Sequence, residues 1–228
     1  MGGEAEMKEA VLLLSGGLDS TTVAAILNSQ GYSIRALTVD YGQRHIREIE
    51  AAKSVASHFK VKEHVVMHVD FSLIGGSALT DMSLSVPEGG TSGIPVTYVP
   101  ARNAVFLSLA LAFSETRQCN EIYTGINAID YSGYPDCRPE FLEAFNRLAR
   151  LATRAGVEGK PARVIAPLIN MRKADIIRAG IAVGAPYGLS WSCYNGREKA
   201  CGLCDSCLLR LKGFMEAGLE DPIDYENK

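Results

Sequence analysis

The sequence predicts an α/β fold: a doubly wound, mainly parallel sheet with helices on both faces, followed by a small C-terminal metal-binding appendage. Short apolar runs alternate with segments of helical spacing, the order that gives parallel strands joined by right-handed crossovers. Four of the six cysteines lie close together near the C-terminus. A chain of 228 residues is long enough for one such domain and a short appendage.

Composition and charge narrow the class of protein. Apolar residues make up 47% of the chain, which allows a packed core. The formal net charge is −3 and both signs are mixed along the sequence, so we expect no nucleic-acid partner and no membrane partner. Residues 1–6 lack the basic and apolar pattern of a secretory signal. The expected location is therefore cytoplasmic.

The first half of the chain alternates strand and helix. Residues 11–14 are a short apolar run typical of a buried parallel strand. A helix follows and is expected to end near Gly31, since glycine favours helix C-termini. Apolar residues at helical spacing predict a second helix at 44–59. The strands that flank this helix are expected at 33–41 and 62–70.

The second half resumes this pattern after an irregular insert. Glycines and prolines in residues 71–100 exclude a long helix or strand, so the insert is expected to be a lid or a mobile loop. Residues 102–116 are apolar on nearly every side and predict a buried helix. The elements expected after it are a strand at 121–126, a helix at 139–155, a strand at 164–168 and a helix at 173–179.

The loops that follow strands are the expected ligand site, because open α/β sheets bind ligands beyond the carboxyl ends of their strands. The first such loop contains Gly16 and Gly17 between a strand and a helix. Glycines allow a tight turn whose N–H groups lie at the positive end of the helix dipole, an arrangement that holds phosphate. Ser15 and Ser20 add hydroxyl donors, and Asp19 adds an acceptor suited to a metal ion on the phosphates.

This loop has neither the Walker lysine nor the GxGxxG fingerprint. Its Ser-Gly-Gly-x-Asp-Ser sequence resembles the pyrophosphate loop (PP-loop) of the N-type ATP pyrophosphatases, which have an adenine nucleotide alpha-hydrolase-like fold. The resemblance implies that ATP is split between its α- and β-phosphates to adenylate a carbonyl oxygen. It implies ATP contacts and catalytic roles for loop residues. The residues expected to bind ATP are Leu14, Ser15, Gly16, Gly17, Leu18, Asp19, Ser20, Thr21, Thr22, Val23 and Ala24.

Catalytic roles are expected for Ser15, Asp19, Ser20 and Lys173. Lys173 follows a predicted strand, where it could neutralise phosphate charge. A solvated lysine at the start of a helix is the alternative for this residue.

The C-terminal cysteines have the spacing of a metal site. Cys193, Cys201, Cys204 and Cys207 form the pattern C-x7-C-x2-C-x2-C. In a reducing compartment such crowding indicates a metal rather than disulfides. Four thiolates suit a structural Zn²⁺, and an iron–sulfur cluster is the alternative, because CxxCxxC also occurs in ferredoxins. The segment has little apolar core of its own, so metal binding is expected to fold it.

A later strand-to-helix loop is dense in polar and aromatic side chains. Tyr131 and Tyr134 can stack on a planar base. Asp130 or Asp136 can accept hydrogen bonds from the amino and imino groups of a guanine-like edge. Arg138 can bind a carboxylate with two parallel hydrogen bonds. This density favours a site for a flat acidic heterocycle over an ordinary tight turn.

Arg102 and Asn103 are two further candidates for the substrate site. They are expected either to orient phosphate or substrate, or only to begin the helix at 102–116.

Several motifs together resemble one family. The chain is similar to the 7-cyano-7-deazaguanine synthase family in SGGLDSTT, DYGQRH at 40–45, VPARN at 99–103, DYSGYPDCRPEF at 130–141 and the cysteine cluster. The resemblance spans about residues 10–215. It implies an ATP-dependent ligase that adenylates 7-carboxy-7-deazaguanine, converts it to an amide with ammonia, and activates the amide with a second ATP to give a nitrile. Such enzymes serve queuosine and archaeosine precursor synthesis.

The resemblance also implies ATP, Mg²⁺ and structural Zn²⁺ as cofactors, and a homodimer. No segment is large enough for a glutaminase, so free ammonium or a partner is expected to supply nitrogen. We expect the PP-loop domain at 8–188 and the zinc-binding segment at 189–228.

Two other functions fit part of the pattern. Enzymes of tRNA thiolation share the loop, but they need an RNA-binding surface and usually extra domains, and this chain has neither a basic bias nor the length. A non-catalytic nucleotide-binding module held together by zinc would bind ATP without releasing pyrophosphate.

Overall fold

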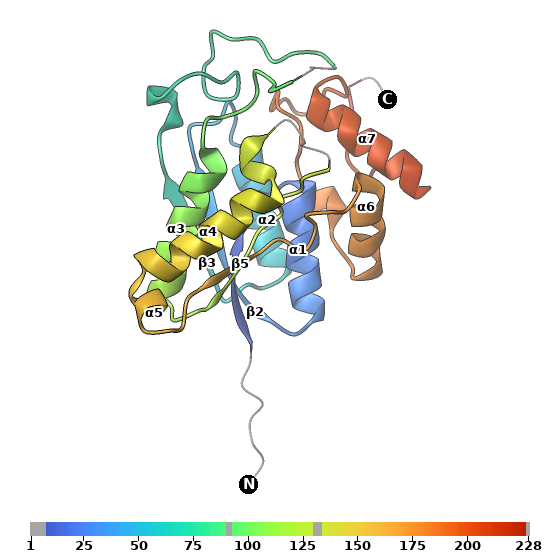
Figure 1. The fold of residues 1–228 in the computed structure, drawn as a ribbon. Helices are drawn as coiled ribbons and strands as arrows, with labels where there is room; N and C mark the ends of the chain where they lie inside the picture. Colours follow the sequence, from blue (N-terminus) through green and yellow to red (C-terminus); the bar gives the residue numbers. More distant parts are fainter. Residues whose placement is uncertain (1–7, 90–92, 130–133, 227–228) are drawn as a thin grey trace.

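The computed structural model describes residues 8–89, 93–129 and 134–226. A sheet lies at its centre (Figure 1). The sheet has five strands in the order β3-β2-β1-β4-β5. Every pairing within this sheet is parallel, which confirms the predicted fold class. The strands are β1 Glu9–Leu13, β2 Ser33–Asp40, β3 Glu63–His68, β4 Glu121–Tyr123 and β5 Arg163–Ile165.

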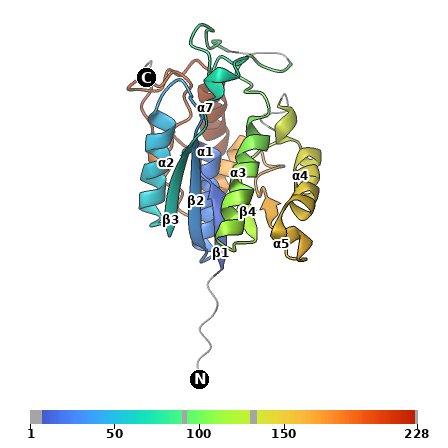
Figure 2. The same ribbon diagram turned by 90° about the vertical axis from the view of Figure 1, so that its left-hand side faces the viewer.

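Helices cover both faces of this sheet (Figure 2). On one face pack α1 Leu18–Ser29, α2 Arg47–His58 and α6 Lys173–Ala182, and on the other α3 Arg102–Thr116 and α4 Pro139–Ala152. Successive residues of β1 belong to opposite cores: Leu12 packs with α1, and Val11 packs with α3. This alternation is why the central strand reads as a continuous apolar run.

The strand order reverses at β1, which pairs with β2 on one edge and with β4 on the other. Such a switch point leaves a crevice outside the carboxyl ends of the strands, because the connections on its two sides run in opposite directions. The loops after β1, β2 and β4 therefore meet at one place.

Several elements are shorter than predicted. The helix expected at 139–155 breaks at Thr153, whose backbone is extended and whose hydroxyl accepts a hydrogen bond from Gly156 N at 2.9 Å, capping α5 Arg154–Val157. α2 begins at Arg47 instead of residue 44. The strands expected at 121–126 and 164–168 are the three-residue β4 and β5. The chain beyond β4 leaves the sheet and lines the crevice.

A helix that the sequence analysis does not predict, α7 Asp205–Ala217, packs against α6. Its buried side includes Arg210 and Gly213, so no apolar stripe marks it in the sequence. Phe214 packs in the same apolar core as residues of α1 and α2. The C-terminal segment thus packs on the main core through α7.

The described residues of the insert, 71–89 and 93–100, are irregular, as predicted, apart from the single turn η1 Phe71–Leu73. Arg44 Nη1 donates to the carbonyl oxygens of Ala78 at 2.7 Å and Leu84 at 2.6 Å. Glu88 forms an isolated bridge with Cys204. These contacts connect the insert to the loop after β2 and to the C-terminal segment.

A buried ion pair holds the C-terminal segment together. Arg210 donates to the two carboxylate oxygens of Asp221 at 2.7 and 2.9 Å, and both side chains are almost fully buried. Tyr225 donates its hydroxyl to the same carboxylate at 2.6 Å. Arg210 also donates to Ser190 Oγ at 2.8 Å and to the Tyr187 carbonyl oxygen at 3.0 Å. One guanidinium therefore joins α7 to two other stretches of chain.

None of the helices that the structure describes combines the length and the apolar character needed to cross a bilayer.

The substitution Asp221→Asn is expected to lower the free energy of unfolding by about 3–5 kcal/mol, because Arg210 would keep a buried charge without its counter-charge. Chemical denaturation measures this value. The control is Glu216→Gln, which removes an exposed pair with Lys212 on α7 and is expected to cost less than about 1 kcal/mol. Equal losses in the two variants would contradict the prediction.

Candidate active site

A cleft lies at the carboxyl ends of β1, β2 and β4. Its walls come from the loop at 15–20, the start of α3, the start of α6 and the segment at 191–194. The loops after strands supply much of it, as the sequence predicts. The predicted site residues that line the cleft are Leu14, Ser15, Gly17, Leu18, Asp19, Ser20, Arg102, Asn103, Tyr134 and Lys173.

The loop at 15–20 sits directly on the backbone of α2. Gly16 has a φ of +82°, and a Cβ there would lie 2.2 Å from the carbonyl oxygen of Glu48 and 2.6 Å from the nitrogen of Ala52. Only glycine fits this position, for both conformational and steric reasons. From the other side, the Trp191 N–H donates to the Gly16 carbonyl oxygen at 2.9 Å.

The first turn of α1 has the features of a phosphate site. Its N-cap is Gly17, and no side chain caps the helix. Ser15 Oγ lies 3.0 Å from Ser20 Oγ and accepts a hydrogen bond from Gly17 N at 3.2 Å. The helix end thus presents N–H groups that no side chain caps and two hydroxyls, which suits an anion.

Asp19 and Lys173 form an ion pair inside this site. Lys173 Nζ lies 2.7 Å from Asp19 Oδ1 and 2.8 Å from Oδ2. Their side chains are only 8% and 14% exposed, for the lysine and the aspartate respectively. Lys173 begins α6, but it lines the cleft and is buried, so it is not the solvated surface lysine of the alternative interpretation.

Four residues expected to bind ATP lie beneath the loop instead. Thr21, Thr22, Val23 and Ala24 are fully buried in α1, and the cleft does not reach them. Thr22 Oγ1 lies 2.7 Å from the hydroxyl of Tyr187. These residues support the loop from the core, and the geometry gives no support for their predicted contact with ATP.

The predicted substrate residues divide into two groups. Asn103 and Tyr134 line the cleft, whereas Asp136 lies behind them and accepts a hydrogen bond from the Asn103 N–H at 3.0 Å. Asn103 Nδ2 donates to the Asp136 carbonyl oxygen at 3.1 Å. Arg138 is exposed at the N-cap of α4 and is not part of the lining. Asp130 and Tyr131 lie outside the described residues.

Arg102 is a cleft cation with no ion-pair partner among the residues that the structure describes. Its guanidinium lies 5.6 Å from the ring centroid of Tyr41, and Nη1 donates to the Tyr41 hydroxyl at a long 3.5 Å. A guanidinium in this state can offer two parallel hydrogen bonds to a carboxylate or a phosphate.

The cleft also contains residues that the sequence analysis does not single out. Glu48 reaches it from the first turn of α2, and burial raises the pKa of this carboxyl to about 7, although Arg102 opposes the shift. For Tyr41, the DYGQRH motif was the one sequence feature that indicated a place in the site. For Glu48 there was no such feature, because helical spacing does not show which part of the fold the polar face of a helix contacts. Other aromatic residues of the lining are Phe106, Trp191 and Tyr194.

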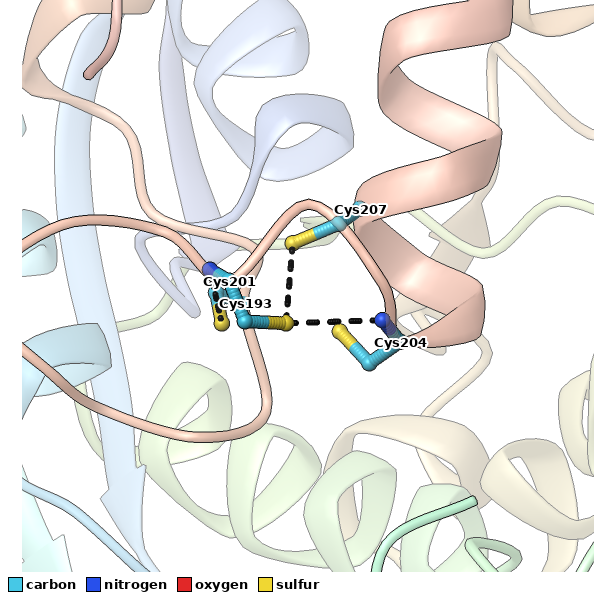
Figure 3. A group of neighbouring side chains, drawn as sticks. All are labelled: Cys193, Cys201, Cys204 and Cys207. Atoms are coloured by element: carbon cyan, nitrogen blue, oxygen red, sulfur yellow. Dashed lines mark hydrogen bonds between the residues drawn. The ribbon is translucent and has the colours of Figure 1, made fainter. Parts of the chain in front are cut away.

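The four C-terminal cysteines converge as predicted (Figure 3). They are buried, and their sulfur atoms all lie within 4.8 Å of one another. The sulfurs of Cys201 and Cys207 are 3.9 Å apart, far longer than the bond of about 2.0 Å in a disulfide. Zinc–sulfur bonds of about 2.3 Å in a tetrahedron place sulfurs about 3.8 Å apart. The cluster therefore fits a single tetrahedral ion.

Backbone and thiol hydrogen bonds stabilise negative charge in this cluster. The N–H groups of Asn195 and Cys201 each donate to Cys193 Sγ at 3.4 Å. Hydrogen bonds from the thiols of Cys204 and Cys207 lower the pKa of Cys193 and raise the pKa of the two donors. A bound cation would replace these shared protons, since it is the thiolate that binds metal.

Comparison with solved structures supports the fold. A crystal structure of a 4-thiouridine synthetase–RNA complex with bound ATP matches with a TM-score of 0.51 at 18% identity. The match covers 96% of this chain and 48% of that chain. At this identity the likeness shows a common fold alone.

Comparison with known sequences shows the family. A protein of Pseudomonas fluorescens (strain SBW25) named 7-cyano-7-deazaguanine synthase is 56% identical to this chain, over 96% of this chain and 99% of the relative. A protein of the same name from Pseudomonas putida (strain W619) is 58% identical to this chain, over 96% of this chain and 98% of the relative. These relatives confirm the predicted resemblance. Residues 9–218 match the family model "Queuosine biosynthesis protein QueC", and the chain belongs to this family.

Proposed function

We propose that the chain is an ATP-dependent ligase that converts 7-carboxy-7-deazaguanine and ammonia to 7-cyano-7-deazaguanine, with release of AMP and pyrophosphate. The product would enter queuosine or archaeosine precursor synthesis. The observation that carries this proposal is the cleft that joins the uncapped first turn of α1, the Asp19–Lys173 pair and Arg102. Relatives at 56–58% identity are named for this activity.

ATP binds with its pyrophosphate on the loop at 15–20. Backbone N–H groups and the hydroxyls of Ser15 and Ser20 donate to phosphate oxygens, and Lys173 offsets their negative charge. Asp19 lines the cleft beside these hydroxyls, and oxygen donors of this kind fit Mg²⁺. Asp19 would hold Mg²⁺, which stabilises charge on the departing pyrophosphate when bound.

Activation with ATP overcomes the poor reactivity of a carboxylate. Arg102 orients the substrate carboxylate toward the α-phosphorus, and the carboxylate oxygen displaces pyrophosphate to give an acyl adenylate. Ammonia then displaces AMP, leaving an amide. A second ATP activates the amide oxygen, and loss of AMP with two protons leaves the nitrile.

The remaining wall of the cleft is suited to a flat heterocycle. The ring of Tyr134 provides a stacking face, and Asn103 provides an amide that Asp136 holds in place. The contacts predicted for Asp130, Tyr131 and Arg138 stay predictions.

The cysteine cluster is proposed to bind structural Zn²⁺. Cys193, Cys201, Cys204 and Cys207 would fill all four positions and leave none for a reacting group. The iron–sulfur alternative fits less well, because a cluster places several iron and sulfide atoms between its thiolates. Trp191, which touches the PP-loop, lies two residues from Cys193, so the metal would stabilise one wall of the cleft.

The finer expectations of assembly and location are also part of this proposal. They are a homodimer, a cytoplasmic location, nitrogen from free ammonium or a partner, and a division into a PP-loop domain at 8–188 and a zinc-binding segment at 189–228.

Purified protein with ATP, Mg²⁺, 7-carboxy-7-deazaguanine and ammonium is expected to form the amide and then the nitrile, as AMP and pyrophosphate accumulate. Mass spectrometry follows the products. Pyrophosphate release is expected to stop when the heterocycle is omitted. ATP binding without any AMP would support the non-catalytic module, and thiolated tRNA from an RNA substrate would support the thiolation alternative. Either result without amide or nitrile would remove the proposed activity.

The substitution Gly16→Ala is expected to lower substrate-dependent pyrophosphate release by roughly 100-fold or more, because the loop must shift away from α2. A pyrophosphate assay measures this. The matched control is Gly184→Ala, where φ is also positive, +76°, but no atom lies within 4 Å of an added Cβ. Retention of activity by Gly16→Ala would contradict the role of the loop.

Metal analysis is expected to find stoichiometric zinc in the purified protein. Cys201→Ser is expected to lose most of this zinc and to unfold at a lower denaturant concentration, because one thiolate ligand is gone. Cys119→Ser is the control, since Cys119 is buried outside the cluster and should leave the zinc content unchanged. Iron with acid-labile sulfide in place of zinc would contradict the assignment.

A further inference from the structure

Glu48 has a carboxyl group in the cleft, and none of the proposed reaction steps involves it. Its backbone carbonyl lies against Gly16 of the PP-loop, and Arg102 is near enough to lower the pKa of its carboxyl. Among the described residues, no hydrogen bond or ion pair reaches the Glu48 carboxylate. The group therefore lies at the PP-loop end of the cleft and is open to a ligand.

The proposed reaction requires a proton acceptor in this cleft. Ammonium is the dominant form of ammonia at neutral pH, and it has no lone pair with which to attack an acyl adenylate. A carboxylate attracts ammonium and can accept its proton. The aromatic residues Tyr41, Trp191 and Tyr194 share the cleft with Glu48, and aromatic faces also attract small cations.

Within the described part of the lining, no other group fits this task as well. This described part of the lining contains no histidine, and its only carboxylates are those of Asp19 and Glu48. Asp19 is already paired with Lys173. Burial raises the pKa of Cys137 to about 12 and also raises the pKa of Tyr41. The pKa of Glu48, about 7, is near the value that suits a general base at neutral pH.

Three influences act on the pKa of Glu48. Burial has the largest effect and raises it, the charge of Arg102 lowers it, and a thiolate at Cys193 raises it.

We propose that Glu48 binds the ammonium ion and acts as the general base that generates the nucleophile, an inference that rests on the proposed function. The carboxylate takes one proton from ammonium, and the freed lone pair forms the C–N bond at the acyl carbon. The C–O bond to AMP breaks, and its electron pair leaves with AMP. The attacking nitrogen loses a second proton to solvent as the amide forms, and no group is oxidised or reduced.

The test separates adenylation from amide formation in Glu48→Gln, which keeps the shape but removes the proton acceptor. Exchange of labelled pyrophosphate into ATP, dependent on 7-carboxy-7-deazaguanine, reports adenylation alone. Hydroxylamine is largely unprotonated at neutral pH, so it should attack the adenylate without a base and give a hydroxamate. We expect kcat/KM for ammonium to fall roughly 100-fold or more, with exchange and hydroxamate formation within about threefold of wild type.

Two variants control this experiment. Glu50→Gln removes an exposed carboxylate from the same helix and should leave every rate unchanged. Glu48→Asp keeps the carboxylate on a shorter side chain and should retain more ammonium-dependent activity than Glu48→Gln.

The outcomes are distinct. Loss of exchange in Glu48→Gln, with an unchanged denaturation midpoint, would place Glu48 in adenylation and overturn this inference. Retention of ammonium-dependent activity would also overturn it. Absence of exchange in the wild-type protein would instead overturn the proposed function, and this inference with it.

Discussion

The contact between Gly16 and the backbone of α2 is the constraint on which the site depends. There is no space for a Cβ between the PP-loop and α2. This contact fixes the first turn of α1 and brings Glu48 of α2 to the same cleft. The Trp191 amide holds the other side of the loop. Because two distant segments hold it, the loop has a fixed shape without a ligand. The ATP binding proposed for it would therefore cost little free energy for ordering the loop.

Some charges in the cleft are paired and others are not, and this difference agrees with the proposed chemistry. Asp19 and Lys173 neutralise each other, whereas neither Arg102 nor Glu48 has an ion-pair partner among the described residues. Partly buried charges without a close partner cost stability and tend to persist where a ligand needs them. An anionic substrate would meet Arg102, and an ammonium ion would meet Glu48. Each reactant thus has a group of opposite charge in one cleft.

The C-terminal segment contributes to the lining of the cleft although it follows the sheet in sequence. Its cysteine cluster lies next to Trp191, and its Arg210–Asp221 pair ties α7 to the stretch at 187–190. Metal binding and the buried ion pair, whose Arg210 also lines the cleft, would both act on the cleft by fixing this wall. A structural metal at this cluster, which would have no open position for a reacting group, could therefore still affect the nearby PP-loop.

The sequence alone determined the alternation of strands and helices from β1 to α6, the glycine turn at 15–20 and the cluster of four cysteines. These features depend on residues close together in the chain, so local pattern is enough to reveal them. Tertiary structure decided the break at Thr153, the helix α7, the burial of residues 21–24 and the place of Glu48 in the cleft. It also joined Lys173 to Asp19 across 154 positions. Such contacts form only when distant segments pack, because a side chain's neighbours across the fold are not encoded by the spacing of residues beside it.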